Sequence, residues 1–206
     1  MKFISIGAIN WGVSNLAVTV MKDGSELPLV TSFEEWKTLS ADRKPCCCAY
    51  DFDPKNQKKF GLLYNPFAIE NIQDIIPDGT RLPARADWDD LLERLGGNVP
   101  LDKQSPSACL LALKSEKGWR RQYVQGMSTD MNGDNTSGFN ALPGGDLFIG
   151  SSFREKGFGS VWWTSEYHKP HITQYDKHVF CFQTSQGISD AADGSCSGAY
   201  IRLVQD

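Results

Sequence analysis

The sequence lacks the features that mark a membrane protein, a nucleic-acid-binding protein or a common enzyme. No apolar run approaches the ~18–20 residues that are needed to cross a bilayer. Neither sign of charge is in strong excess, because 21 basic and 25 acidic side chains give a formal net charge of −4. This mild acidity argues against broad electrostatic binding to nucleic acid or anionic lipid. The motifs G-x-S-x-G and H-E-x-x-H and a glycine-rich phosphate loop are missing, so we expect no enzyme activity.

A secretory signal peptide is not evident. The N-terminus starts like one, but Ser5, Gly7 and Asn10 interrupt its apolar stretch, and no small-residue cleavage site follows. We therefore interpret residues 3–9 as a first strand. A chain of this kind would reach an extracellular place as part of a larger assembly, such as a virion.

The cysteines are not arranged for a disulfide framework or a zinc site. Cys46, Cys47 and Cys48 are adjacent, and adjacent side chains point in alternate directions, so they cannot all find disulfide partners. No C-x-x-C occurs, which leaves a thiolate zinc site without support. We expect mostly reduced thiols that are buried as small hydrophobic groups.

The composition and the spacing of turn residues predict an α+β fold in one domain over residues 1–206. Hydrophobic residues make up 40% and charged residues 22% of the chain, as in folded globular proteins. The 19 glycines, 10 prolines and 6 tryptophans indicate many turns around large aromatic side chains and exclude an all-helical bundle. Short apolar segments of strand length, separated by turn residues, predict a small antiparallel sheet with long loops. They occur at residues 16–21, 147–149, 161–163, 179–182 and 199–204.

Two helices can be predicted from local patterns. Over residues 85–95, Trp88, Leu91 and Leu92 belong to an apolar stripe with helical spacing, and two glycines follow it. Over residues 31–39, Ser32 can cap a short helix, with Glu35 three residues later. Trp162 and Trp163 would project from opposite faces of a strand, and we expect both to belong to the scaffold.

Several segments, in this order, resemble the Fibrobacter succinogenes major paralogous domain, a family abundant in gut Bacteroidetes and their phages. Those that carry most of the resemblance are residues 60–65, 79–83, 137–145, 162–167 and 198–204. The stretch S-G-F-x-A-L-P-G-G followed by W-W-x-S-E is the most specific part. The resemblance covers roughly residues 10–206.

The resemblance implies a C-type-lectin-like fold. In that fold two helices, here residues 60–69 and 85–95, pack on short antiparallel strands with long loops, and a final strand pairs back near the N-terminus. Pro66 departs from the family pattern and would shorten or kink the first helix. Formylglycine-generating enzymes share the wider fold, but Cys181 and Cys196 match no motif of theirs.

This fold family also resembles the variable proteins of diversity-generating retroelements. In those proteins a lectin-like scaffold carries a mutagenised stretch on its ligand-facing surface. Mutagenised AAC codons cannot encode Trp, Met, Lys, Gln or Glu, and residues 189–200 contain none of these five types. Ordinary loops share this composition, so a diversified binding protein and a non-diversified relative both stay open.

The candidate ligand-binding residues lie between Tyr167 and Ser197. Aromatic and histidine side chains combine apolar faces with polar tips, which suits recognition. Strand alternation places His178, Phe180 and Phe182 on one face, and that face is either core or a partner-contacting patch. The predicted contact residues are Tyr167, His168, His171, Thr173, Tyr175, His178, Phe180, Phe182, Ser189, Asp190, Asp193, Ser195 and Ser197.

Two possible metal sites are weaker interpretations. His168, His171 and His178 could converge on zinc, but Pro170 disfavours the helix that would align the first two. Residues 130–135 space oxygen side chains as calcium loops do. The EF-hand pattern fails there, because Asn135 replaces its glycine and no glutamate stands at its twelfth position. We expect an Asx-rich turn, with no metal and no cofactor.

The sequence thus predicts a non-enzymatic ligand- or receptor-binding protein of adhesion type. Its partner would be a protein or glycan receptor on a cell surface, without nucleic acid or membrane insertion, and an oligomer is allowed. The expected location is a virion tail or a bacterial cell surface. The alternative is a metal-dependent carbohydrate-binding lectin-like domain of a Bacteroidetes surface protein.

Overall fold

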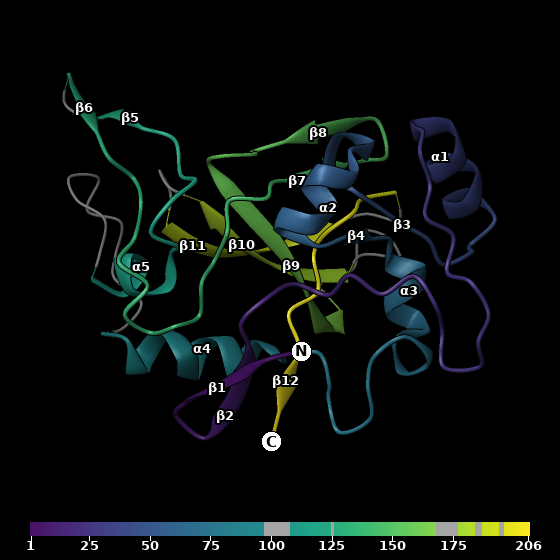
Figure 1. Cartoon of the computed structure of the whole chain (residues 1–206), viewed down its shortest axis with the longest axis horizontal. Coiled ribbons are helices and arrows are strands. Elements are labelled where there is room, and N and C mark those ends of the chain that lie inside the picture. The colour runs from purple at the N-terminus through teal and green to yellow at the C-terminus, as the bar shows by residue number, and fades with distance from the viewer. Residues whose placement is uncertain (97–107, 125, 168–176, 184–186, 194–195) are drawn as a thin grey trace.

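Helices and small antiparallel sheets both occur in the computed structural model, so the predicted α+β class is confirmed. It describes residues 1–96, 108–124, 126–167, 177–183, 187–193 and 196–206, and only the backbone at 124, 167, 177–183 and 187–193. The helices are α1 (Phe33–Ala41), α2 (Pro54–Phe60), α3 (Pro66–Glu70), α4 (Arg85–Arg94) and α5 (Ala108–Leu113), with 3-10 turns η1 (Tyr50–Phe52) and η2 (Ile72–Asp74). Helices α1 and α3 lie towards one end of the molecule, and α5 towards the other (Figure 1).

Within the described residues, the strands form two three-stranded sheets and three two-stranded sheets. One sheet has the order β1-β2-β12, from β1 (Phe3–Ile6), β2 (Ile9–Gly12) and β12 (Val204–Gln205). The other has the order β11-β10-β9, from β9 (Gly159–Tyr167), β10 (Lys177–Gln183) and β11 (Gly187–Asp193). The two-stranded sheets pair β3 (Cys47–Cys48) with β4 (Leu63–Tyr64), β5 (Gln122–Val124) with β6 (Met127–Thr129), and β7 (Asp146–Phe148) with β8 (Ser152–Arg154).

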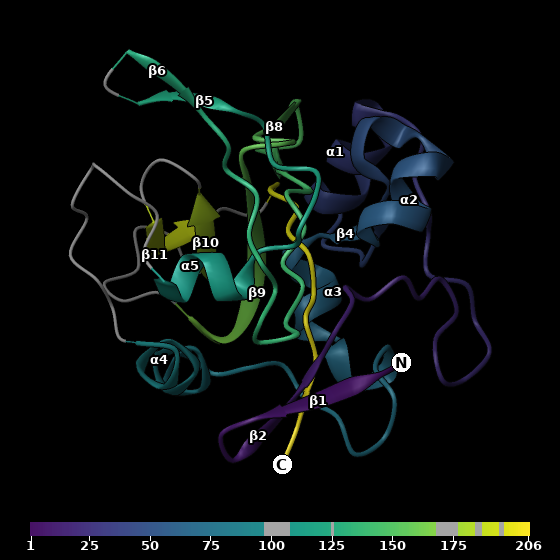
Figure 2. The ribbon, with the colours of Figure 1, turned by 60° about the vertical axis from the view of Figure 1, so that its left-hand side comes forward.

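The two ends of the chain lie side by side. Strand β12 pairs antiparallel with β2, and Val204 lies opposite Trp11. The labels N and C both lie in the lower part of the molecule in every view of the whole chain (Figure 2). The pairing of the last strand near the N-terminus, which the family resemblance implied, is therefore confirmed. The predicted strand over residues 3–9 becomes a hairpin, because Gly7 takes a positive φ of 70° and turns the chain.

Both helices that were predicted from local patterns are present. Helix α4 buries Trp88, Leu91 and Leu92, and the Asp87 carboxylate accepts the Ala84 N–H at its start. At α1 the Ser32 hydroxyl accepts the Glu35 N–H at 3.1 Å, as the capping spacing predicts. In both cases the signals lie within one or two turns of the helix itself.

The helix implied for residues 60–69 is wrong. Helix α2 ends at Phe60, because Gly61 has a φ of 84° and packs against the backbone of Leu16. The chain then forms β4, and a separate helix α3 starts at Pro66. The predicted strand at 16–21 is absent, since the Leu16 N–H donates to the Ile201 carbonyl and the Val18 N–H to the Tyr64 hydroxyl.

The core divides into two clusters on either side of β9. Trp162 packs in a cluster with Trp11, Trp88 and Phe139, whereas Trp163 packs with residues such as Leu62. Both side chains are fully buried. Their indole N–H groups donate to the Asn15 side chain at 2.9 Å and to the Tyr64 carbonyl at 2.8 Å. The prediction that both tryptophans belong to the scaffold is confirmed, and β9 is one of the segments that contribute to both clusters.

The buried thiols agree with the sequence prediction for most of the cysteines. Cys46, Cys47, Cys48 and Cys109 are free and buried, and Cys196 is free and partly buried. Burial raises the pKa of Cys47 to about 12 and that of Cys109 to about 11, which keeps these groups as neutral thiols. Among the residues that the structure covers, no helix combines the length and the apolarity needed to span a membrane.

We predict that Asn65→Ala lowers the free energy of unfolding by about 2–3 kcal/mol. The buried Asn65 side chain accepts the N–H groups of Cys46 and Ala68 and donates to the Lys44 carbonyl at 2.8 Å. Alanine would remove the cap of α3 and leave buried partners unsatisfied. Urea denaturation measures the loss. Asn71→Ala, at an exposed asparagine, is the control, and equal losses in both variants would contradict the prediction.

Candidate functional site

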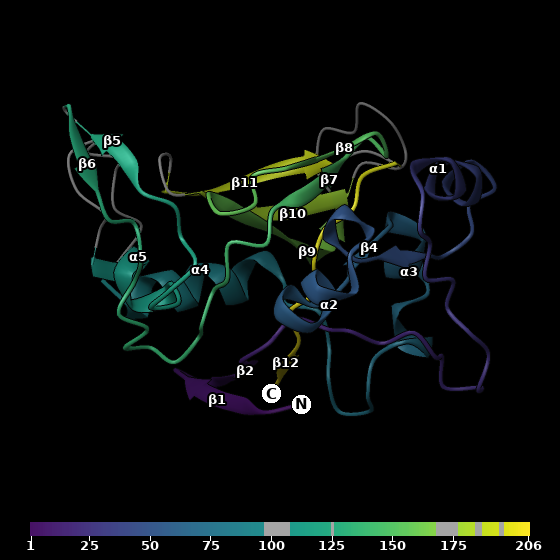
Figure 3. The same cartoon turned by 45° about the horizontal axis from the view of Figure 1, so that its top comes forward.

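Seven of the thirteen predicted contact residues lie on the sheet β11-β10-β9. They are Tyr167 on β9, His178, Phe180 and Phe182 on β10, and Ser189, Asp190 and Asp193 on β11. In the register, Phe180 pairs with Asp190 on one side and with Trp162 on the other. Positions that are up to 26 residues apart in the sequence therefore belong to one sheet, which stands above the sheet β1-β2-β12 in Figure 3.

The other predicted contact residues divide into two groups. His168, His171, Thr173, Tyr175 and Ser195 lie outside the described residues. The prediction that Ser197 is a contact residue is wrong, because Ser197 is fully buried and does not line a surface. Its hydroxyl accepts the Ile149 N–H at 3.4 Å, in the turn between β7 and β8.

The segment that contains Ser197 is part of the scaffold. The Trp36 indole donates to the Cys196 carbonyl at 2.8 Å, and Gly198 and Leu147 exchange backbone hydrogen bonds at 2.8 and 2.9 Å. A Cβ atom on Gly198 would lie 2.9 Å from the Trp36 ring, so a larger residue does not fit there without movement. Small residues such as Ser197 and Gly198 are typical of a loop in sequence. In this structure they are buried in close packing instead.

A pocket of about 490 Å³ lies beside the end of β9. Its walls come from α3, η2, the segment before α4, and β9. The Ser165 N–H donates to the Pro83 carbonyl at 3.0 Å and ties β9 to the segment before α4. The lining residues are Ile69, Glu70, Ile72, Gln73, Arg81, Leu82, Ala84 and Ser165.

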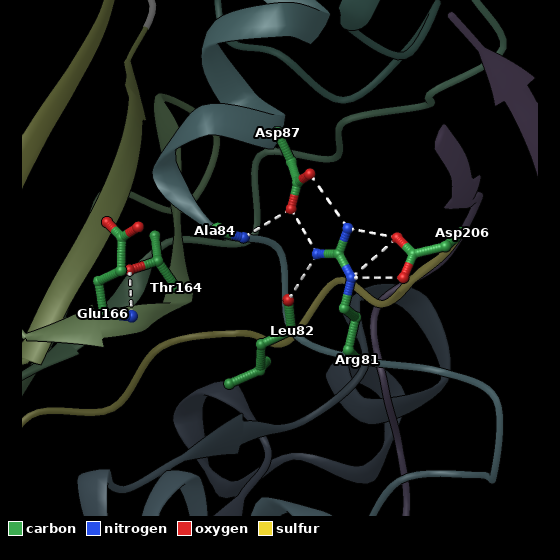
Figure 4. A network of polar contacts seen from close by, with 7 residues as sticks. All are labelled: Arg81, Leu82, Ala84, Asp87, Thr164, Glu166 and Asp206. Atoms are coloured by element: carbon green, nitrogen blue, oxygen red, sulfur yellow. Dashed lines mark hydrogen bonds and ion pairs between the residues drawn. The ribbon is translucent and has the colours of Figure 1, made fainter. Parts of the chain in front are cut away.

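Arg81 is the centre of the polar network next to this pocket (Figure 4). Its guanidinium donates to Asp87 through both terminal nitrogens, to Asp206 through Nε and Nη2, and to the Leu82 carbonyl at 3.2 Å. These bonds use all five N–H donors of the side chain. The Arg81 contacts hold the pKa of the Asp206 carboxyl below its usual value. The same Asp87 carboxylate accepts the Ala84 N–H, so the network also fixes the start of α4.

The predicted Asx-rich turn at residues 130–135 is confirmed. The Asp130 carboxylate accepts the Asn132 N–H at 3.0 Å, and the Asp134 carboxylate accepts the Thr136 N–H at 3.0 Å. Within the part of the chain that the structure covers, no group of three or more His, Cys, Asp or Glu side chains is placed to hold a metal ion.

The sequence carries little functional signal at the pocket residues. Arg81 lies in one of the segments that carry the family resemblance, but its two carboxylate partners are 6 and 125 residues away. An arginine with a nearby Asp in a predicted first turn is a weak local signal. The contribution of Asp206 has no local signal at all.

Comparison with known proteins gives one family. The model of the Fibrobacter succinogenes major domain matches residues 4–205. No curated protein matches the chain. No solved structure matches it either.

Proposed function

The chain belongs to the Fibrobacter succinogenes major domain family, and we propose that it is a non-enzymatic binding protein. Its partner is a protein or glycan receptor on a cell surface, and its contact surface is the sheet β11-β10-β9 with the adjoining loops. The main support is the register of that sheet, which brings seven of the predicted contact positions onto neighbouring strands. A location on a virion tail or a bacterial surface is part of the same proposal.

The proposal includes a C-type-lectin-like fold. The α+β class and the pairing of β12 with β2 support it. It also includes a division between a fixed scaffold and a contact region that tolerates change. The segment at Cys196–Gly198 sets the C-terminal limit of that region, because it is held by hydrogen bonds with Trp36, Leu147 and Ile149.

Diversification of the contact region is a further part of the proposal, and it is tested in the DNA. A neighbouring reverse transcriptase gene and a near-copy of the 3′ end of the coding sequence are expected. A genomic neighbourhood without either would leave a binding protein with a constant surface. The composition of residues 189–193 is compatible with the diversified form, and the genomic test decides between the two forms.

The binding proposal predicts that His171→Ala/Tyr175→Ala lowers receptor affinity at least about tenfold while the melting temperature changes little. Aromatic side chains dominate contact energy, and truncation of such a group costs about 2 kcal/mol or more. Affinity is measured on a glycan array and on intact bacterial cells. Tyr123→Ala is the matched control, because Tyr123 is an aromatic residue with 83% exposure on the separate β5–β6 hairpin.

Two outcomes count against this proposal. Binding that survives the double variant, or that is lost only with Tyr123→Ala, would move the contact surface elsewhere. Binding that disappears when EDTA is added would instead support the metal-dependent carbohydrate-binding alternative.

A further inference from the structure

The pocket beside the end of β9 combines apolar walls with a polar rim. Ile69 and Leu82 are buried, and Ile72 and Ala84 complete the apolar side of the pocket. Its volume of about 490 Å³ falls within the ~300–1,000 Å³ typical of small-ligand sites. The polar residues of its lining are Glu70, Gln73, Arg81 and Ser165.

The charge at the rim is unsuited to an anion. All five N–H donors of Arg81 are already used, and two carboxylates, Asp87 and Asp206, offset its single positive charge. Glu70 adds a third carboxylate. Its ion pair with Arg43 is long, at 3.9 Å, and its side chain is about 29% exposed. The formal charge of Arg43, Arg81, Asp87, Asp206 and Glu70 together is 2 − 3 = −1.

We propose that this pocket receives the side chain of a lysine from a protein partner. The four apolar walls match the aliphatic stem of that side chain. The Glu70 carboxylate and the Gln73 amide oxygen accept from its ammonium group, which carries three donors and no acceptor. Ser165 is two residues before Tyr167, so the pocket borders the proposed contact sheet. The inference does not depend on that sheet, because an amine can bind here whether or not the sheet contacts a receptor.

The test uses Nα-acetyl-lysine N-methylamide as the probe, titrated into the ¹⁵N-labelled chain. We expect saturable shifts of the amide signals of Ile69 and Ser165 and an affinity in the millimolar range. Acetyl-norleucine N-methylamide has a similar stem without the charge, and should bind at least about fivefold more weakly. Glu70→Gln should weaken binding of the lysine probe by about fivefold. Glu116→Gln, which removes an exposed carboxylate outside the pocket, should leave it unchanged.

Ser165→Phe provides a second variant, since it adds a large side chain at a lining position while the backbone of residue 165 keeps its hydrogen bond to Pro83. It should abolish the shifts of Ile69. The inference is overturned if norleucine and lysine probes bind equally, if Glu70→Gln has no effect, or if acetyl-glutamate or methyl mannoside shifts the same signals. Putrescine that binds more tightly than the lysine probe would identify a free amine, rather than a partner protein, as the ligand.

Discussion

Trp162→Ala and Trp163→Ala are each expected to lower the free energy of unfolding by about 3–5 kcal/mol. Each substitution removes a fully buried indole from a different core cluster. Trp162→Ala also deprives Asn15 of its indole donor, and Trp163→Ala leaves the Tyr64 carbonyl without one. Because domains are stable by only about 5–15 kcal/mol, either loss is a large part of the total. Guanidinium denaturation, followed by far-UV circular dichroism, measures it.

The conservative variants separate packing from hydrogen bonding. Trp162→Phe keeps an aromatic ring near Trp88 and Phe139, whose ring centroids lie 5.9 and 6.2 Å from that of Trp162. It should therefore cost less than Trp162→Ala. A loss below about 1 kcal/mol for both alanine variants would show that neither indole contributes much to the stability of its cluster. A loss confined to one of them would show that only one cluster supports the fold.

The features that could be predicted from sequence are those with local causes. Ser32 and Glu35 determine the start of α1 within a single turn, and the spacing of Trp88, Leu91 and Leu92 determines which face of α4 is buried. The opposite orientation of the two neighbouring tryptophans also has a local cause. A strand alternates its side chains whatever it packs against, so opposite burial of Trp162 and Trp163 follows from the strand alone.

The wrong predictions concern backbone whose partners are distant in sequence. Residues 16–21 have the composition of a strand, but Leu16 and Val18 find their hydrogen-bond partners at Ile201 and Tyr64. The helix expected over residues 60–69 fails at Gly61, where close contact with Asn15 and Leu16 requires a residue without a side chain. The surface position predicted for Ser197 was also wrong, because its hydrogen-bond partner Ile149 is distant in sequence. Nothing in its neighbourhood indicates that the β7–β8 turn covers it.

The candidate site also has one part that could be predicted from the sequence and one part that could not. Aromatic and histidine residues in the last third of the chain suggested a contact surface by composition, and strand pairing explains how they can meet. The pocket could not be predicted, because Glu70, Arg81 and Ser165 come from three separate segments. A residue that acts through contacts 125 positions away, as Asp206 does with Arg81, needs the tertiary structure to be recognised.

Lys114→Met is expected to raise the free energy of unfolding at pH 7 by about 1–2 kcal/mol. Lys114 is fully buried, and its ammonium donates to the Met131 carbonyl at 3.2 Å and lies 4.6 Å from the centroid of the Trp119 ring. No carboxylate pairs with it among the described residues. Burial lowers its pKa to about 8, so at pH 7 the folded protein bears the desolvation cost of a charged amine. Methionine keeps most of the stem and removes that cost.

The pH dependence distinguishes this effect from simple repacking. Below pH 8 both the folded and the unfolded chain hold the Lys114 proton, and the cost is constant. Between pH 8 and the ordinary lysine value of 10.5, the folded chain has released the proton and the unfolded chain still binds it, so the wild type gains stability as the pH rises. The advantage of Lys114→Met should therefore shrink between pH 7 and pH 10, whereas the exposed control Lys117→Met should show no such change. A variant that is less stable than the wild type at both pH values would mean that the contacts with Met131 and Trp119 outweigh the desolvation of the amine.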